Sequence, residues 1–229
     1  MYIKTTRGRF LSECKNRFLC KVKVQEEEVE CYVPSSSRLQ NYLTLDECEV
    51  LLTANKSPKA RTKYALFAVI HEGQFIILNL NKVNYIIENL IHASMLYSEH
   101  EYAIYREKLL DNNYKSDLYL ISEKTNSDII IEAKGIISDE ENTVFPQVNS
   151  ERSLEQLYKI RDLLKRGREV HYFLVSLSPV IKRVNFEEDS KYTKLLRECV
   201  DEGLKLKTLR LLYNGYKISH DESLKIGKL

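Results

Sequence analysis

A run of apolar, β-branched residues interrupted by two opposite charges constrains the fold of this chain more than any other stretch. Segment 128–137 reads D-I-I-I-E-A-K-G-I-I. Such a run is typical of a buried strand, on which side chains two residues apart point to the same face. Glu132 and Lys134 therefore share one face, and Ala133 lies on the other. Buried charges are costly unless they are paired with each other or bind something, so this charge pair needs an explanation.

A second predicted strand carries another carboxylate. Segment 115–121 reads K-S-D-L-Y-L-I, with Asp117 near its start. If the two strands pair side by side, Asp117, Glu132 and Lys134 converge at one point. Two carboxylates and one ammonium group suit a divalent metal ion and an activated water.

The E-x-K spacing by itself supports such a site only weakly. In a chain with 30% charged residues the pattern arises by chance, and Glu13-Cys14-Lys15 is such a case. The alternative is an exposed strand edge that carries an ion pair of little energetic consequence. The pattern alone favours this alternative, whereas the isoleucine-rich context and the strand with Asp117 favour a site.

The composition is that of an ordinary globular protein. Its 229 residues, 43% of them hydrophobic, allow one large or two small domains with a substantial core. The net charge is only +2, so any nucleic-acid contact needs a local basic patch. The five scattered cysteines show no zinc spacing, and no apolar leader or membrane-length apolar segment is present. We therefore expect a cytoplasmic protein with reduced thiols and no membrane contact.

The first third of the chain is predicted to be β-rich. Short apolar or alternating runs predict strands at 18–24, 29–33, 50–53, 64–71 and 74–80. Five short strands in about 80 residues fit a small OB-like barrel. We place this all-β domain at residues 1–81.

Residues 82–229 are expected to form an α/β domain, because helical and strand patterns alternate there. A helical period at 81–97 opens it, and a helix at 150–165 has Ser150 as its N-cap and ends at Gly167. Further patterns predict a helix at 191–202 and strands at 103–109, 115–121, 128–137, 170–177 and 205–213. Segment 138–149 is expected to be a polar loop.

Ordered sequence blocks over nearly the whole chain resemble the sugar fermentation stimulation protein A family. The blocks are Arg17-Phe18-Leu19, the loop 31–39, the hairpin and helix start at 64–84, Arg106-Glu107, Lys115-Ser116-Asp117, Glu132-Ala133-Lys134-Gly135, and Phe145-Pro146 followed by Ser150-Glu151-Arg152. The resemblance implies an OB-like domain joined to an α/β domain of the PD-(D/E)xK nuclease type, together with DNA binding and stimulation of sugar metabolism. The chain departs from the family pattern at Ser35-Ser36-Ser37, Gln147, Ser153 and Gln156.

With this resemblance, Asp117, Glu132 and Lys134 become the expected catalytic residues of a nuclease that hydrolyses phosphodiester bonds. Asp117 and Glu132, with Glu107 as a third acidic ligand, are expected to bind Mg²⁺ or Mn²⁺, and Lys134 to orient or deprotonate the attacking water. A surface glutamate on an edge strand is an equal alternative for Glu107. Gln156 is expected either to reach the site or to lie on a solvated helix face.

Nucleic acid, DNA rather than RNA, is the expected partner. Arg152 in the first turn of its helix and Lys115 beside Asp117 are expected to contact phosphate. Arg17, Arg38 and the basic loop 56–63 would form the binding surface of the barrel, although each of these side chains taken singly reads as a solvated cation.

Two other functions stay open. The main alternative is a non-catalytic DNA-binding regulator of sugar metabolism genes that retains the nuclease fold, and a protein-interaction module is the third option. The sequence does not predict the oligomeric state, for which a homodimer is one option.

Overall fold

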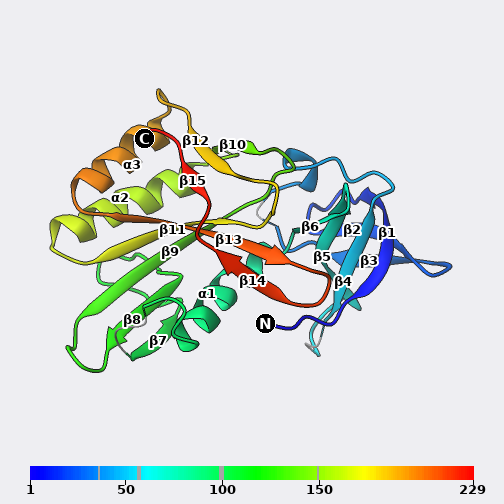
Figure 1. Cartoon of the computed structure of the whole chain (residues 1–229), viewed down its shortest axis with the longest axis horizontal. Helices are drawn as coiled ribbons and strands as arrows, with labels where there is room; N and C mark the ends of the chain where they lie inside the picture. Colours follow the sequence, from blue (N-terminus) through cyan, green and yellow to red (C-terminus); the bar gives the residue numbers. More distant parts are fainter. Residues whose placement is uncertain (36, 56–57, 98–100, 149) are drawn as a thin grey trace.

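The structure is a computed structural model that describes residues 1–35, 37–55, 58–97, 101–148 and 150–229. A β-barrel, blue to cyan in Figure 1, lies beside a larger α/β part, whose helices α2 and α3 lie at the far end from the barrel. No helix in the described ranges is long and apolar enough to cross a membrane.

The N-terminal sheet closes into a barrel. Its strands are β1 (Thr6–Glu13), β2 (Leu19–Val24), β3 (Glu27–Tyr32), β4 (Glu49–Ala54), β5 (Tyr64–His71) and β6 (Gln74–Ile77). They follow the order β3-β2-β1-β4-β5-β6, and a parallel pairing of β3 with β5 closes the barrel. This confirms the expected OB-like barrel. The sequence pattern missed β1, because Phe10 is the only fully buried residue of that strand and no apolar alternation marks it.

The second large sheet carries the α/β part. Its order is β14-β13-β11-β9-β8-β7, and β9, β11 and β13 run parallel. The strands are β7 (Tyr102–Arg106), β8 (Leu118–Ser122), β9 (Asp128–Ile136), β11 (Val170–Ser176), β13 (Lys205–Tyr213) and β14 (Ile218–Asp221). The strands β8 and β9 are antiparallel neighbours, which is the pairing that the sequence argument required.

Three helices cover the two faces of this sheet. The helices α2 (Glu151–Lys165) and α3 (Lys191–Asp201) pack on one face, and α1 (Val83–His92) and the barrel pack on the other. Helix α1 is shorter than the expected 81–97 at both ends. A 3-10 turn at Leu80–Lys82 precedes it, and the helix ends at His92, just before Ser94 adopts a positive φ of 53°. Helix α2 begins at Ser150, whose hydroxyl accepts a hydrogen bond from the Ser153 N–H, as expected for an N-cap.

The expected polar loop at 138–149 is wrong in part. It contains β10 (Asn142–Phe145), which pairs with β12 (Arg183–Phe186), and β12 pairs in turn with β15 (Lys225–Ile226). Each of these strands has four residues or fewer, so the apolar alternation is too short to be recognised in the sequence.

The apolar run of β9 is explained by a core on each face of the sheet. Ile129 and Ile131 belong to a cluster that also contains the barrel interior and the buried face of α1. Ile130 and Ile136 belong to a second cluster beneath α2 and α3. A strand that is buried on both faces needs apolar residues at successive positions.

Candidate active site

The site forms at the first residue of β8, where the antiparallel strand β9 extends beyond its pairing with β8. The last β8–β9 pair is Leu118 with Ile131, and the Asp117 N–H donates to the Ile131 carbonyl at 3.1 Å. Beyond this point the edge of β9 is no longer paired with β8. The Asp117 carboxylate takes the place of a strand there, because its Oδ2 accepts from the Ala133 N–H at 2.8 Å.

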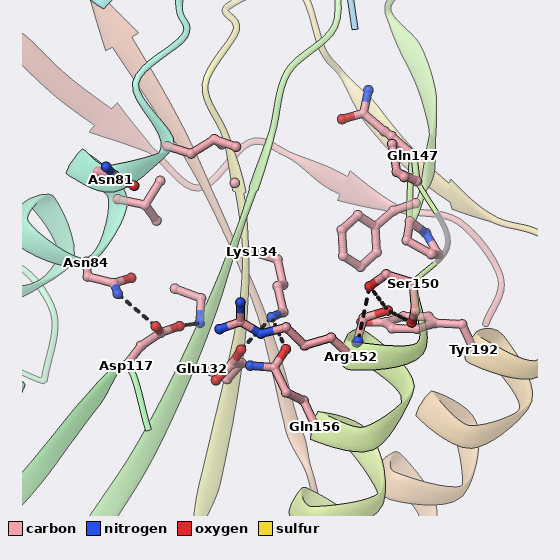
Figure 2. A pocket seen from close by; sticks show the side chains of 18 of the residues that line it. Asn81, Asn84, Asp117, Glu132, Lys134, Gln147, Ser150, Arg152, Gln156 and Tyr192 are labelled. Atoms are coloured by element: carbon pink, nitrogen blue, oxygen red, sulfur yellow. Dashed lines mark hydrogen bonds and ion pairs between the residues drawn. The ribbon is translucent and has the colours of Figure 1, made fainter. Parts of the chain in front are cut away.

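The second oxygen of Asp117 is held by helix α1. Asn84 Nδ2 donates to Asp117 Oδ1 at 2.8 Å, as Figure 2 shows. Burial and, after it, the negative charge of Glu132 raise the pKa of Asp117 to about 6. A raised pKa in a carboxyl group next to a second carboxylate is typical of a site prepared for a cation or a proton.

Glu132 is buried among donors. Its side chain is almost fully enclosed, with 1% of the residue exposed. The Tyr114 hydroxyl donates to Oε2, and Lys134 Nζ donates to Oε1. Lys134 Nζ also donates to Gln156 Oε1 at 2.9 Å, so Gln156 of α2 does reach the site. Burial and the charge of Glu132 raise the pKa of Tyr114 well above its ordinary value, so the phenol stays a donor.

These side chains line a pocket of about 410 Å³. The start of α1 forms one wall with Asn81 and Asn84, and the start of α2 forms the other with Ser150 and Arg152. Figure 2 shows the Arg152 side chain extending from α2 toward Glu132 and Lys134. A guanidinium group carried by the first turn of α2 therefore lies near the carboxylates.

Gln147 lies at the pocket but does not serve the carboxylates. Its Nε2 donates to the Ile137 carbonyl, and its Oε1 accepts from the Ile137 N–H at 3.3 Å. The side chain thus continues the hydrogen bonding of β9 past its end. Its departure from the family pattern leaves the contacts of Asp117 and Glu132 untouched.

The structure does not bring Glu107 or Lys115 into the pocket. The Glu107 carboxylate is exposed and accepts from Lys115 Nζ, and this ion pair lowers the pKa of Glu107. Among the residues that the structure describes, no three His, Cys, Asp or Glu side chains group closely enough to hold a metal ion. The expected third ligand is therefore bonded elsewhere, because the neighbouring ammonium group attracts it.

The two barrel arginines also lie outside this pocket. Arg38 donates to the carbonyls of Cys14 and Lys15, at 3.3 and 3.0 Å, so it braces the β1–β2 loop. The exposed Arg17 guanidinium lies 4.7 Å from the centre of the Phe18 ring on the same loop. Ser36 and Lys56, at the start of the basic loop 56–63, are outside the described residues.

Sequence reasoning missed two residues that touch the carboxylates, Asn84 and Tyr114. Asn81 and Asn84 are three apart at a helix start and share one face, which was a usable signal. Tyr114 lies in the turn before β8, where no local pattern marks it. Its contact with Glu132 exists only because β8 and β9 pair.

Comparison with known proteins identifies relatives of both parts of the chain. Residues 13–78 match the family model described as the SfsA N-terminal OB domain, and residues 81–216 match the sugar fermentation stimulation protein RE domain.

Curated relatives and a solved structure cover most of the chain. A sugar fermentation stimulation protein homolog of Natranaerobius thermophilus is 31% identical over 197 residues, 82% of this chain and 80% of the relative. Another, from Alkaliphilus metalliredigens, is 24% identical over 225 residues, 96% of this chain and 95% of the relative. The solved SfsA of Pyrococcus furiosus superposes with a TM-score of 0.86 at 19% identity, over 100% of this chain and 98% of that chain. This last likeness shows the shared fold.

Proposed function

Because this chain belongs to the sugar fermentation stimulation protein family, and because its RE-domain match contains a pocket with two carboxylates and a lysine, we propose that it is a nucleic-acid-binding, metal-dependent nuclease. The observation that carries the proposal is the meeting of Asp117, Glu132 and Lys134 where β9 runs past β8. In this proposal, residues 82–229 cleave the phosphodiester and residues 1–81 help to hold the nucleic acid, with DNA favoured over RNA.

The chemistry of the two carboxylates fits a hard divalent cation. Each of their oxygens accepts one hydrogen bond and has further lone-pair directions to offer. Burial and, after it, the negative charge of Glu132 raise the pKa of Asp117, and a bound cation would stabilise both ionised carboxylates.

Mg²⁺, or Mn²⁺ in its place, matches such a donor set. Mg²⁺ is commonly held by one or two carboxylates together with water and substrate phosphate, so a third acidic ligand is not required. The Pyrococcus furiosus relative is described in complex with Ca²⁺, another ion that prefers oxygen ligands, and this supports a cation site in the family.

The residues of the chain would then divide the work of hydrolysis. A bound ion supplies polarisation of a phosphate oxygen and a lowered pKa of a water. Lys134, held between Glu132 and Gln156, can donate to a phosphate oxygen and offset the charge that develops there. Arg152, at the positive end of α2, orients the phosphate.

The test is cleavage of labelled nucleic acid by the full chain. Single-stranded and duplex DNA and RNA are incubated with Mg²⁺, Mn²⁺ or EDTA. We expect cleavage only with the metal ions, and a loss of at least about 100-fold in Glu132→Gln and Lys134→Ala. Glu141→Gln is the matched control, because Glu141 forms an exposed ion pair with Lys182 and does not line the pocket. It should cleave at the unmodified rate.

Binding measured against salt concentration separates the remaining functions. We expect a steep salt dependence whose slope falls by about one unit in Arg152→Ala. Binding without cleavage in any metal, unchanged in Glu132→Gln and Lys134→Ala, would establish the non-catalytic regulator instead. A slope near zero would point to a protein partner.

A further inference from the structure

The pocket is too small and too deep for a double helix. Its volume of about 410 Å³ lies in the range of roughly 300–1,000 Å³ found for pockets that enclose small molecules. Glu132 is 1% exposed at its floor, so a phosphate must enter the pocket to reach the carboxylates. A duplex keeps its bases paired and stacked inside the helix, so a base can enter such a pocket only when it is unpaired.

The lining suits one nucleotide. The charged and amide groups that a phosphate needs, among them Lys134, Arg152 and Asn84, gather around the carboxylates (Figure 2). The lining also contains apolar and aromatic side chains, among them those of Tyr42, Leu80, Val83, Phe145, Pro146 and Val148. A base and its sugar present the apolar faces that such a lining accepts.

Three aromatic side chains line the pocket. Phe145 and Tyr192 of the α/β part are buried, whereas Tyr42, which comes from the barrel, is partly exposed. Tyr42 follows the 3-10 turn Leu39–Asn41, and its N–H donates to the Leu39 carbonyl at 2.8 Å. The Glu13 carboxylate at the end of β1 accepts from the Leu39 N–H at 2.8 Å and so anchors this turn to the barrel. Tyr42 also packs against the core that the barrel shares with α1, so its ring is held beside the site.

We propose that the pocket takes one unpaired nucleotide of a single-stranded substrate, with its phosphate at Asp117, Glu132 and Lys134 and its base against Tyr42. The inference rests on the proposed function and specifies its substrate. It also assigns a task to the contact between barrel and α/β part, because both then hold the same nucleotide. Stacking on an aromatic ring tolerates every base, so little sequence preference is expected at this position.

The first test uses the unmodified protein. A fluorescein-labelled thymidine homopolymer is offered alone and annealed to its adenosine complement, with binding followed by anisotropy in Ca²⁺ and cleavage followed in Mn²⁺. We expect the single strand to bind and to be cleaved at least tenfold better than the duplex. Thymidine 5′-monophosphate should compete with the strand.

The second test compares variants at the pocket. Tyr42→Ala should weaken binding of the strand about tenfold, as expected for a lost stacking partner, whereas Tyr42→Phe should stay within twofold. Tyr158→Ala, which removes an exposed tyrosine of α2 that does not line the pocket, is the control. Val148→Trp, at a lining residue that is 41% exposed, fills the pocket and should weaken binding even if Tyr42→Ala fails to fold.

The outcomes separate this inference from the nuclease proposal. Equal cleavage of single-stranded and duplex DNA, or equal binding by Tyr42→Ala and Tyr42→Phe, would overturn the proposed nucleotide pocket. Neither result would contradict the proposed nuclease function. Strand-selective binding that depends on Tyr42 without any cleavage supports the pocket and overturns the nuclease. Failure to bind either form overturns both.

Discussion

Glu132 and Asp117 show, at the scale of single residues, two ways of keeping a carboxylate out of water. Glu132 is compensated by a phenol and an ammonium group that both donate to it. Asp117 receives only neutral donors, from Asn84 and the Ala133 backbone, and burial beside Glu132 raises its pKa. The ionised form of Asp117 therefore costs folding free energy, as is common where a site is kept ready for a ligand.

Replacing Asp117 by a neutral residue should remove this cost and so stabilise the fold at high pH. The pKa of Asp117 is about 6 in the fold against 3.8 for the free side chain, so its contribution to stability is greatest below pH 3.8 and is lost as the pH rises through 6. We expect Asp117→Asn to raise the free energy of unfolding at pH 8, without metal, by on the order of 2 kcal/mol and to change it little at pH 4. Urea unfolding at both pH values measures this.

The same variant should lose its response to metal. Mn²⁺ should raise the melting temperature of the unmodified protein, because a ligand that binds only the folded state stabilises it, and should leave Asp117→Asn unchanged. Asp111→Asn, at an exposed aspartate, is the control and should stay within about 0.5 kcal/mol. A destabilised Asp117→Asn at pH 8 would contradict the argument.

At the scale of secondary structure, the site depends on an uneven pair of strands and on two helix starts. The strand β9 extends beyond its pairing with β8, and the Ala133 N–H on its free edge donates to the Asp117 carboxylate. The starts of α1 and α2 line the pocket next to this edge. Gly135 lets the α1 side come close, since a Cβ there would lie 2.6 Å from a methyl group of Leu80. Because both helices pack on the sheet, they hold Asn84 and Arg152 at fixed positions next to the carboxylates.

The two N-caps allow a matched test of the α2 start. Ser150 and Ser190 each accept from the N–H three residues on, at 3.1 Å in both helices. We expect Ser150→Ala and Ser190→Ala to cost a similar amount of unfolding free energy, about 1 kcal/mol each. Only Ser150→Ala should also weaken nucleic-acid binding, because α2 carries Arg152. Chemical denaturation and anisotropy measure the two effects, and equal binding by both variants would refute the role of the α2 start.

At the scale of the whole molecule, barrel and α/β part share one hydrophobic core. Phe67 of β5 packs edge to face on Tyr213 of β13, with ring centres 5.1 Å apart. The N-terminal residues also join the far end of the chain, since the Ile3 N–H donates to the Tyr216 carbonyl at 2.7 Å. This shared core holds Tyr42 at a fixed position relative to the carboxylates.

A buried histidine in the same core should make the fold sensitive to acid. Burial lowers the pKa of His171 from 6.5 to about 4, while its ring contacts the Tyr97 hydroxyl and the Glu169 carboxylate. Because the folded state resists protonation, stability should fall by on the order of 3 kcal/mol as the pH drops from 6.5 to 4. The lowered pKa of Glu169 acts in the same direction and the raised pKa of Asp117 acts against it.

Urea unfolding between pH 7 and pH 4 tests this, with His171→Gln beside His92→Gln. The first variant should lose most of the pH dependence, and the second, at an exposed histidine of α1, should keep it. An unchanged slope in His171→Gln would show that other groups control acid sensitivity.

Local sequence determined the elements whose signal lies within one segment. The apolar run of β9, the cap and stripe of α2 and the bounds of β13 could be predicted, because burial and capping act on neighbours along the chain. The strands β10, β12 and β15 could not, since each is too short for a pattern and is held by partners far away in the sequence.

For the site, the sequence alone indicated that Asp117, Glu132 and Lys134 would converge once β8 and β9 paired, because strand periodicity sets the face of each side chain. Only the tertiary structure decided the rest. It brought Tyr114 and Asn84 to the carboxylates, turned Glu107 to Lys115, and set Tyr42 of the barrel in the pocket wall. The physical reason is that a polar side chain bonds to the donor or acceptor that folding places nearest, and that neighbour is chosen by packing between segments rather than by the order of residues.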